Sequence, residues 1–347
     1  ATYVDDATGL IKTTPVNLLT YSEEFDQWDQ LFNATVTANA ALAPDGTMTA
    51  DRVRLPASSG TGALNSYVST SGNHTGTIYV KAVTPGTDNT FNLYLGSPSE
   101  LFTATDEWQR FTFTLNTSHF RFGIVNGDDS FVTDVLVWGA QLEEGTTATP
   151  YIKTGSTISG AARYENGELL LEPASTNLSL YGRQFDAINA NSWLPINGGA
   201  VPTIAADTHT APDGTSSGVY MADTIAGATG TAFNGNVVRQ LVTIASSVKY
   251  TFSLYIKLLT ATQASIYIRD GTTGSVSSSS TQNTQGWQRV VVTSSANLSS
   301  SVNSLYIGNT NGTIAVWGAQ VEAAPYATSY IPTTSSAVTR AADVSTS

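Results

Sequence analysis

Acidic side chains that recur at matched places in the chain are the first candidates for chemistry. Cleavage of a glycosidic bond needs two carboxyl groups that face one sugar. Three acidic pairs recur along the chain: Asp26 with Asp186, Asp45 with Asp213, and Glu143 with Glu322. Asp45 and Asp213 stand in Pro-Asp-Gly turns, where an aspartate caps its own backbone. We expect Glu143 and Glu322 to bind backbone donors or to pair with the repeated Arg110 and Arg289, so the residues argue against an enzyme.

Composition removes several other classes of function. The 347 residues include no Cys, which excludes disulfide scaffolds, thiolate zinc sites and thiol nucleophiles. The three His, at positions 74, 119 and 209, have no counterparts in the repeat, which disfavours a histidine metal site or catalytic triad. The net charge of -12 repels phosphate, so we expect no nucleic-acid partner. No segment approaches the ~18 apolar residues of a membrane span, so we expect no membrane insertion.

An internal repeat organises the chain. Matching blocks are 17–18 with 177–178 (Asn-Leu), 43–47 with 211–215 (Ala-Pro-Asp-Gly-Thr), and 138–143 with 317–322 (Trp-Gly-Ala-Gln, an aliphatic residue, Glu). The blocks keep their order, and the period far exceeds the ~20–50 residues of solenoid repeats. We therefore predict two copies of one domain, at 1–157 and 158–347. We also expect both ends of the sequence to be boundaries within a longer polypeptide.

Apolar and polar residues alternate with a period of two, as in 111–115 (Phe-Thr-Phe-Thr-Leu) and 265–269 (Ser-Ile-Tyr-Ile-Arg). Such runs, bounded by Gly, Asn, Asp and Ser, are typical of short strands that bury one face. No amphipathic helix of three turns is found. The chain is therefore predicted to be all-β, with two tandem antiparallel β-sandwiches.

The order of these blocks resembles a module of bacteriophage structural proteins. The resemblance rests on 17–26 (Asn-Leu-Leu-Thr-Tyr-Ser-Glu-Glu-Phe-Asp), Trp-Gln-Arg at 108–110 and Trp-Gly-Ala-Gln-Leu-Glu at 138–143. The stretch 163–178 resembles the connector before such modules in tail-fibre and virion-surface proteins. The strand order is also similar to jelly-roll carbohydrate-binding modules of the galactose-binding-like type. These resemblances imply jelly-roll domains on a virion surface, with a polysaccharide or host cell-surface glycan and other virion proteins as partners.

The jelly-roll resemblance also implies a structural calcium ion near the terminal strands. Asp134, before the last strand of the first copy, is a plausible ligand. Calcium takes roughly six to eight oxygen ligands, and the matching region around Gly312 has no acid. Calcium at Asp134 therefore stays open, and we expect no other cofactor.

Sugar binding depends on aromatic rings that stack on the C–H face of a sugar, with amide, Arg or Lys groups beside them. In 78–81 (Ile-Tyr-Val-Lys), Ile78 and Val80 point inward, so Tyr79 and Lys81 share the other face. We expect one sheet of each domain to present such residues outward: Tyr79, Lys81, Asn92, Tyr94, Arg121, Tyr255, Lys257, Tyr267, Arg269 and Tyr306. Trp28 and Trp193, in irregular segments, are added as candidates.

Three functions remain open at this point. The first is a non-catalytic module that attaches the virion to a host-surface glycan. The second is a structural spacer or decoration domain, because Tyr is also common on ordinary solvated sheets. The third is a polysaccharide depolymerase.

Overall fold

Among the residues that it describes, the computed structural model has strands as its regular structure, apart from one short 3-10 helix, η1 (Phe25–Gln27). It describes residues 1–31, 33–57, 63–68, 71–84, 89–95, 99–117, 121–127, 131–185, 193–196, 203–206, 209–216, 220–224, 237–244, 248–283, 286–298, 302–310 and 312–343. Among these residues, no helix has the length and hydrophobicity to cross a membrane.

The chain forms two compact units. Thr14–Ala161 make the first sandwich, and Ala162–Ser347 together with Ala1–Thr13 make the second sandwich. The first thirteen residues thus belong with the second unit, whereas the sequence places them in the domain at 1–157. The junction also falls four residues later than predicted, between Ala161 and Ala162.

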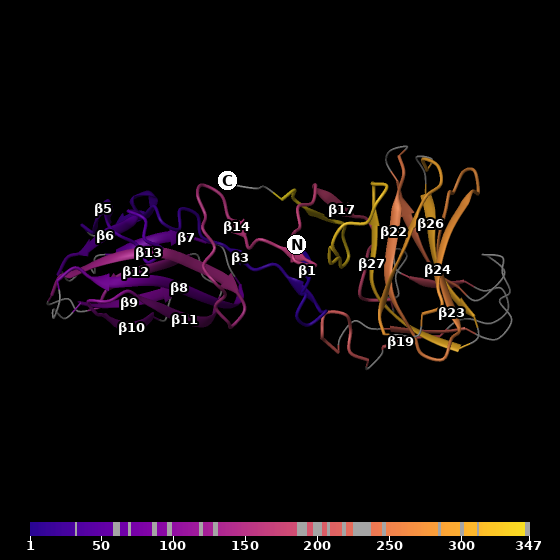
Figure 1. Ribbon diagram of the computed structural model, residues 1–347, viewed down its shortest axis with the longest axis horizontal. Helices are drawn as coiled ribbons and strands as arrows, with labels where there is room; N and C mark the ends of the chain where they lie inside the picture. The colour runs from indigo at the N-terminus through magenta and orange to yellow at the C-terminus, as the bar shows by residue number, and fades with distance from the viewer. Residues whose placement is uncertain are drawn as a thin grey trace. The chain divides into compact units, whose positions relative to one another are not determined.

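The first sandwich consists of two antiparallel five-stranded sheets (Figure 1). One, the β9 sheet, has the order β10 (Ser99–Ala104), β9 (Asn89–Leu95), β12 (Arg121–Asn126), β7 (Ala63–Tyr67), β4 (Asp29–Leu31). The other, the β8 sheet, has the order β11 (Gln109–Thr117), β8 (Gly72–Ala82), β13 (Thr133–Glu144), β6 (Ala50–Leu55), β5 (Thr35–Ala41).

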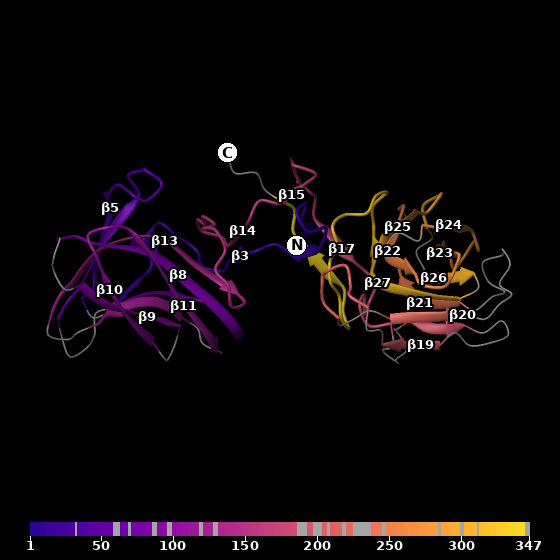
Figure 2. The same cartoon turned by 60° about the horizontal axis from the view of Figure 1, so that its bottom comes forward.

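The second sandwich repeats this arrangement (Figure 2). Its β23 sheet has the order β24 (Val276–Thr281), β23 (Gln263–Arg269), β26 (Val302–Thr310), β21 (Val237–Thr243), β18 (Leu194–Ile196). Its β22 sheet has the order β25 (Gln288–Thr293), β22 (Thr251–Leu258), β27 (Gly312–Glu322), β20 (Tyr220–Thr224), β19 (Thr203–Ala206). The matching strand orders confirm the predicted fold of two antiparallel jelly-roll sandwiches.

Each core lies between the two sheets and follows the predicted alternation. Ile78 and Val80 of β8 and Phe122 and Ile124 of β12 are fully buried in the first sandwich. Burial of each such side chain stabilises the fold by about 1.5–3 kcal/mol. The residues between them therefore face outward, where a ligand could reach them.

Short strands close each sandwich and attach its ends. β3 (Val16–Asn17) pairs with β14 (Ser159–Gly160) in the first, and β17 (Ser175–Asn177) pairs with β28 (Val338–Arg340) in the second. The second also carries two hairpins, β1 (Thr2–Val4) with β2 (Ile11–Thr13), and β15 (Tyr164–Glu165) with β16 (Glu168–Leu169).

The β1–β2 hairpin explains why the first residues belong to the second sandwich. Val4 and Ile11 join an apolar cluster with Trp317 on the outer side of the β22 sheet. The Ile11 amide donates a hydrogen bond of 2.9 Å to the Pro212 carbonyl oxygen. Apolar burial and backbone pairing together fix the hairpin there.

Candidate functional site

The most strongly repeated motifs form a structural clasp. The buried Asn17 Nδ2 donates to the carbonyl oxygens of Ala140 and Ile152, at 3.0 and 2.9 Å, and its Oδ1 accepts from the amides of Leu19 and Leu142. In the second sandwich, the equivalent bonds of Asn177 involve Ala319, Ile331, Ser179 and Val321. The clasp ties the first strand to the last, so these motifs recur for folding rather than for chemistry.

Glu143 and Glu322 also have structural roles. Glu143 accepts hydrogen bonds from the Thr149 amide at 3.0 Å and from Gln141 Nε2 at 2.6 Å. Glu322 accepts from the Thr328 amide at 2.9 Å. Both carboxylates are buried. This confirms the prediction that they bind backbone donors; Arg110 donates to the Thr149 carbonyl oxygen instead of pairing with Glu143.

Among the described residues, the remaining recurrent acids cap turns or lie exposed. Asp45 accepts from the Thr47 amide at 2.9 Å and hydroxyl at 2.7 Å, and these bonds lower the pKa of Asp45. Asp213 caps Thr215 in the same way, which confirms the predicted turns. Asp26 is exposed on η1 and accepts from the Gln27 amide group. Asp186 and His119 lie outside the described residues.

Asp134 is engaged in an ion pair. Its two carboxylate oxygens accept from Arg52 Nε and Nη2, at 2.8 and 2.6 Å. In the described part of the chain, no group of three or more metal-ligating side chains comes together. Arg52 therefore already binds both carboxylate oxygens of Asp134, the residue that the sequence suggested as a calcium ligand.

Trp28 and Trp193 are core residues, contrary to the prediction. Their exposed fractions are 5% and 2%. Trp28 packs against Phe25, with ring centroids 4.8 Å apart, and Trp193 against Phe185 at 5.2 Å. Neither ring offers a face to a sugar, because the sandwich fills both sides.

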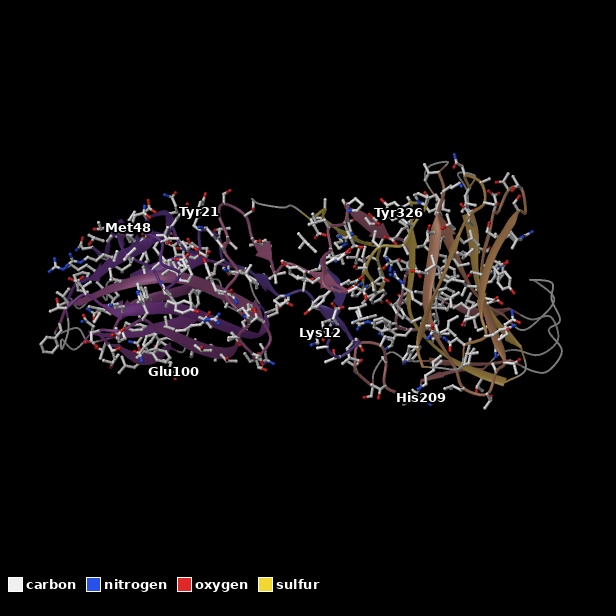
Figure 3. All side chains as sticks on the ribbon, viewed as in Figure 1. Lys12, Tyr21, Met48, Glu100, His209 and Tyr326 are labelled. Atoms are coloured by element: carbon white, nitrogen blue, oxygen red, sulfur yellow. The ribbon has the colours of Figure 1, made fainter. Side chains whose placement is uncertain are left out.

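The predicted outward residues fall on two sheets in each sandwich rather than on one. Tyr79, Lys81, Tyr255 and Lys257 lie on the β8 and β22 sheets, whereas Asn92, Tyr94, Arg121, Tyr267, Arg269 and Tyr306 lie on the β9 and β23 sheets. The two faces of a sandwich point in opposite directions: Met48, in the turn between β5 and β6, and Glu100, on β10, lie on opposite sides of the first sandwich in Figure 3. One ligand cannot contact both sets within a sandwich.

On the β8 and β22 sheets, other side chains of the protein cover the tyrosine rings. The Tyr79 ring meets Trp138 edge to face at 5.4 Å, and the Arg110 guanidinium lies 5.7 Å from its centroid. Tyr255 is enclosed in the same way by Trp317 at 5.6 Å and by Arg289 at 5.5 Å. These two rings therefore have structural roles. The remaining candidates for a sugar-binding surface are the outer faces of the β9 and β23 sheets.

On the outer face of the β9 sheet, Tyr94, Gly123 and Asn65 are direct neighbours on three adjacent strands. A Cβ atom at Gly123 would lie 2.8 Å from Tyr94 Cε1 and 2.4 Å from Asn65 Oδ1. The two side chains therefore lean together over the glycine. Only a residue without a side chain permits this approach.

Asn65 is the most informative residue of this face, and the sequence reasoning missed it. It is 1% exposed, and neither its Oδ1 nor its Nδ2 has a hydrogen-bond partner among the described residues. A buried amide without partners is costly and asks for an explanation. Beside it, burial raises the pKa of Tyr94 to about 12, while Arg121 acts in the opposite direction.

The rim of the same face is open. Tyr67 is 58% exposed and was also not predicted. The Arg121 guanidinium lies over its ring, 5.4 Å from the centroid, and the two residues are register partners on β12 and β7. The face thus combines an accessible aromatic ring, a cation and an unsatisfied amide.

The outer face of the β23 sheet holds a different row. Tyr267, Tyr306 and Arg239 are direct neighbours on β23, β26 and β21, and Arg269 lies at the end of β23. Tyr306 is 5% exposed between its two neighbours. The prediction thus located Tyr267, Arg269 and Tyr306 on one face but missed Arg239.

No protein-family model and no curated protein sequence matches the chain. Among solved structures, it is similar to the N-terminal tandem CBM22 domains of Paenibacillus barcinonensis Xyn10C, with a TM-score of 0.31 and 12% identity over 90% of this chain and 99% of that one. It is also similar to a Paenibacillus xanthan lyase, with a TM-score of 0.32 and 10% identity over 91% of this chain and 26% of that one. A glycoside hydrolase family 43 arabinoxylan arabinofuranohydrolase from Bacillus subtilis gives a TM-score of 0.28 and 12% identity, over 85% of this chain and 67% of that one. Scores this low carry no argument about function, which has to come from the faces themselves.

Proposed function

We propose that the protein binds carbohydrate, without catalysis, through the outer face of the β9 sheet. The unpaired Asn65 amide is the observation that carries this proposal. An amide offers both a donor and an acceptor, which matches the hydroxyl groups of a sugar. A ligand that supplied both bonds would remove the cost of the buried, unsatisfied group.

The neighbouring residues supply the other interactions that a sugar needs. The exposed Tyr67 ring presents an apolar surface for the C–H face of a sugar, and Arg121 adds donors beside it. Because Asn65 is almost fully buried, a hydroxyl reaches its amide only when the Tyr94 ring moves away from Gly123. We therefore assign Tyr94 the role of a movable cover over the amide.

The biological setting belongs to the proposal as well. The resemblance of the repeated motifs to phage virion modules favours a host-surface glycan as the target and a virion surface as the location. Two sandwiches that each bind weakly would gain avidity on a repetitive polysaccharide when the spacing lets both engage. The non-catalytic role is supported by Glu143 and Glu322, whose oxygens are used within the fold.

Glycan-array binding tests the proposal. We expect Tyr67→Ala and Asn65→Leu each to weaken binding at least ~10-fold, the effect of one good hydrogen bond or stacking contact. Tyr326→Ala is the matched control, because Tyr326 is a similarly exposed tyrosine of the second sandwich (Figure 3). Binding that is equal in all three variants and the parent would refute the proposed face.

Two results would favour the alternatives. Absence of binding to every glycan on the array would favour the spacer or decoration domain. Release of new reducing ends from a host polysaccharide would favour the depolymerase.

A further inference from the structure

The outer face of the β23 sheet differs in charge from its counterpart in the first sandwich. Register places Arg239, Tyr306 and Leu194 where the β9 sheet has Asn65, Gly123 and Asp29. A neutral amide is thus replaced by a guanidinium, and an exposed carboxylate by a leucine. The two faces are built on the same strands but cannot prefer the same ligand.

The strand pattern directs Arg239 to this face. Its neighbours Val238 and Gln240 are both buried, and Gln240 bonds to Ser179 and Leu180 in the interior. Arg239, between them, is partly exposed on the opposite side. Direct neighbours across antiparallel strands lie about 4.5–5.5 Å apart at Cβ, so the side chains of Arg239 and Tyr306 start from adjacent positions on this face.

No acid of the described chain neutralises this cation. The Arg239 side chain makes no hydrogen bond or ion pair with a described residue. Asp270, at the end of β23, is the nearest acid in sequence to the face, but it is 2% exposed and accepts from the amides of Thr272 and Thr273. The arginine therefore remains available to an external anion.

We infer that the β23 face binds a carboxylated saccharide, with Arg239 pairing the carboxylate and Tyr267 contacting the sugar ring. This inference rests on the proposed function, because it assumes that the outer faces bind sugars. A guanidinium fits a carboxylate through two parallel hydrogen bonds, and such charge-assisted bonds are roughly twice as strong as neutral ones. A uronic acid within a polysaccharide offers both required groups, a carboxylate and an apolar ring face.

The overall charge sets a condition on this interaction. At -12 the protein repels a polyanion at long range. Salt near 0.15 M screens charges over about 8 Å, so the repulsion fades while a close ion pair persists. Recognition must therefore depend on contact with Arg239 and not on general attraction, which distinguishes it from non-specific polyanion binding.

The test measures binding of the whole chain to polygalacturonate, alginate and hyaluronan, each paired with its carboxyl-reduced form, at about 0.15 M salt. We expect at least one acidic polymer to bind about tenfold more tightly than its reduced form. Arg239→Gln abolishes that preference. Arg54→Gln, which removes an exposed arginine from the β8 sheet, keeps it and controls for the change in net charge.

The outcomes separate this inference from the proposed function. Equal binding of acidic and reduced polymers, a preference that survives Arg239→Gln, or no binding of any acidic polymer would overturn the inference. If Tyr67→Ala still weakens glycan binding in that case, the proposed function stands without it. If no glycan binds at all, both fail. Arg239→Lys guards against misfolding, because it keeps the charge and should retain part of the preference.

Discussion

The two sandwiches share a strand order but protect the same outer face by different means. In the second, Val4 and Ile11 of the β1–β2 hairpin lie in one cluster with Trp317 and the fully buried Ala315. In the first, the larger Leu136 stands at the position of Ala315. The corresponding cluster of the first sandwich, around Trp138, contains Trp108 and Tyr151 and, among the described residues, none from an added hairpin.

The Pro-Asp-Gly turns beside these faces show the same difference. A Cβ atom at Gly214 would lie 3.1 Å from Leu10 of the hairpin, whereas nothing lies within 4 Å of the equivalent position at Gly46. The clasp around Asn17 and Asn177 is nevertheless the same in both. The duplicated domain has therefore kept its internal framework and changed its surfaces.

The largest effect is expected from substitutions that break the shared framework in one sandwich at a time. Asn17→Ala leaves four buried backbone groups unpaired and should cost about 4 kcal/mol of unfolding free energy in the first sandwich alone. Asn177→Ala should do the same in the second. Urea unfolding followed by hydrogen exchange of peptides from each sandwich separates the two effects. If either variant destabilised both sandwiches equally, the independence of the two frameworks would be wrong.

Ile11→Ala removes part of the hairpin's apolar contact. We expect the second sandwich to lose about 2 kcal/mol, the lower end of the cost of truncating a buried isoleucine. The first sandwich should keep its stability although it directly follows the hairpin in sequence. Lys12→Ala is the adjacent control and should change little, since its ion pair with Asp5 is exposed. Thermal unfolding of both variants, resolved by sandwich, checks this.

The two capping turns should show a smaller difference. Asp45→Ala and Asp213→Ala each remove a bond to a backbone amide and should cost about 1 kcal/mol in their own sandwich. Asp213→Ala should cost a few tenths of a kcal/mol more, because Asp213 also pairs with Arg183 at 3.0 Å. An equal or reversed order in denaturant midpoints would show that the arginine contributes nothing.

The smallest expected effect is on how the stability of each sandwich depends on pH. In the second sandwich, burial acts to raise the pKa of Glu172, but bonds from Arg163 and the Ser329 amide outweigh it and hold that pKa below 4.5. Its stabilisation is present above pH 4.5 and is lost as the pH falls through the lowered pKa. In the first, burial raises the pKa of Asp51 above 3.8, so the folded state holds its proton more tightly and gains stability as the pH falls.

Acidification should therefore act in opposite directions at these two sites. Glu172→Gln should flatten the acid loss of the second sandwich, and Asp51→Asn should flatten the gain of the first. Unfolding free energies measured from neutral to acid pH, one sandwich at a time, provide the comparison. The same slope in parent and variant would exclude the carboxylate concerned as the cause.

Alternation and repetition predicted the framework well. The inward positions of Ile78 and Val80 followed from period two, and the capping roles of Asp45 and Asp213 followed from local turn chemistry. Each depends on residues close in sequence. The site was harder, since Asn65 lies on β7, where four consecutive residues are buried and no alternation marks the strand.

Other errors have the same physical origin, contacts between distant parts of the chain. Trp28 follows η1, which directs its ring into the core beside Phe122 of β12, with ring centroids 6.2 Å apart, a placement that no periodicity records. The partner of Asp134 is Arg52, which meets it only through the register of β13 with β6. Hairpin residues 1–13 bind a surface made near the opposite end of the chain. Single-sequence patterns contain no such register.

The early hairpin also sets an order of events during synthesis. The first sandwich contains all of its own strands and can fold as soon as Ala161 has left the ribosome, because domains fold as units from the N-terminus. Residues 1–13 emerge before it but must wait for Trp317 and Tyr330, which are made only after the whole first sandwich. Closing such a long loop is slow compared with local pairing. The second sandwich therefore reaches its final state only when residues 1–13 meet a surface that is made after the first sandwich.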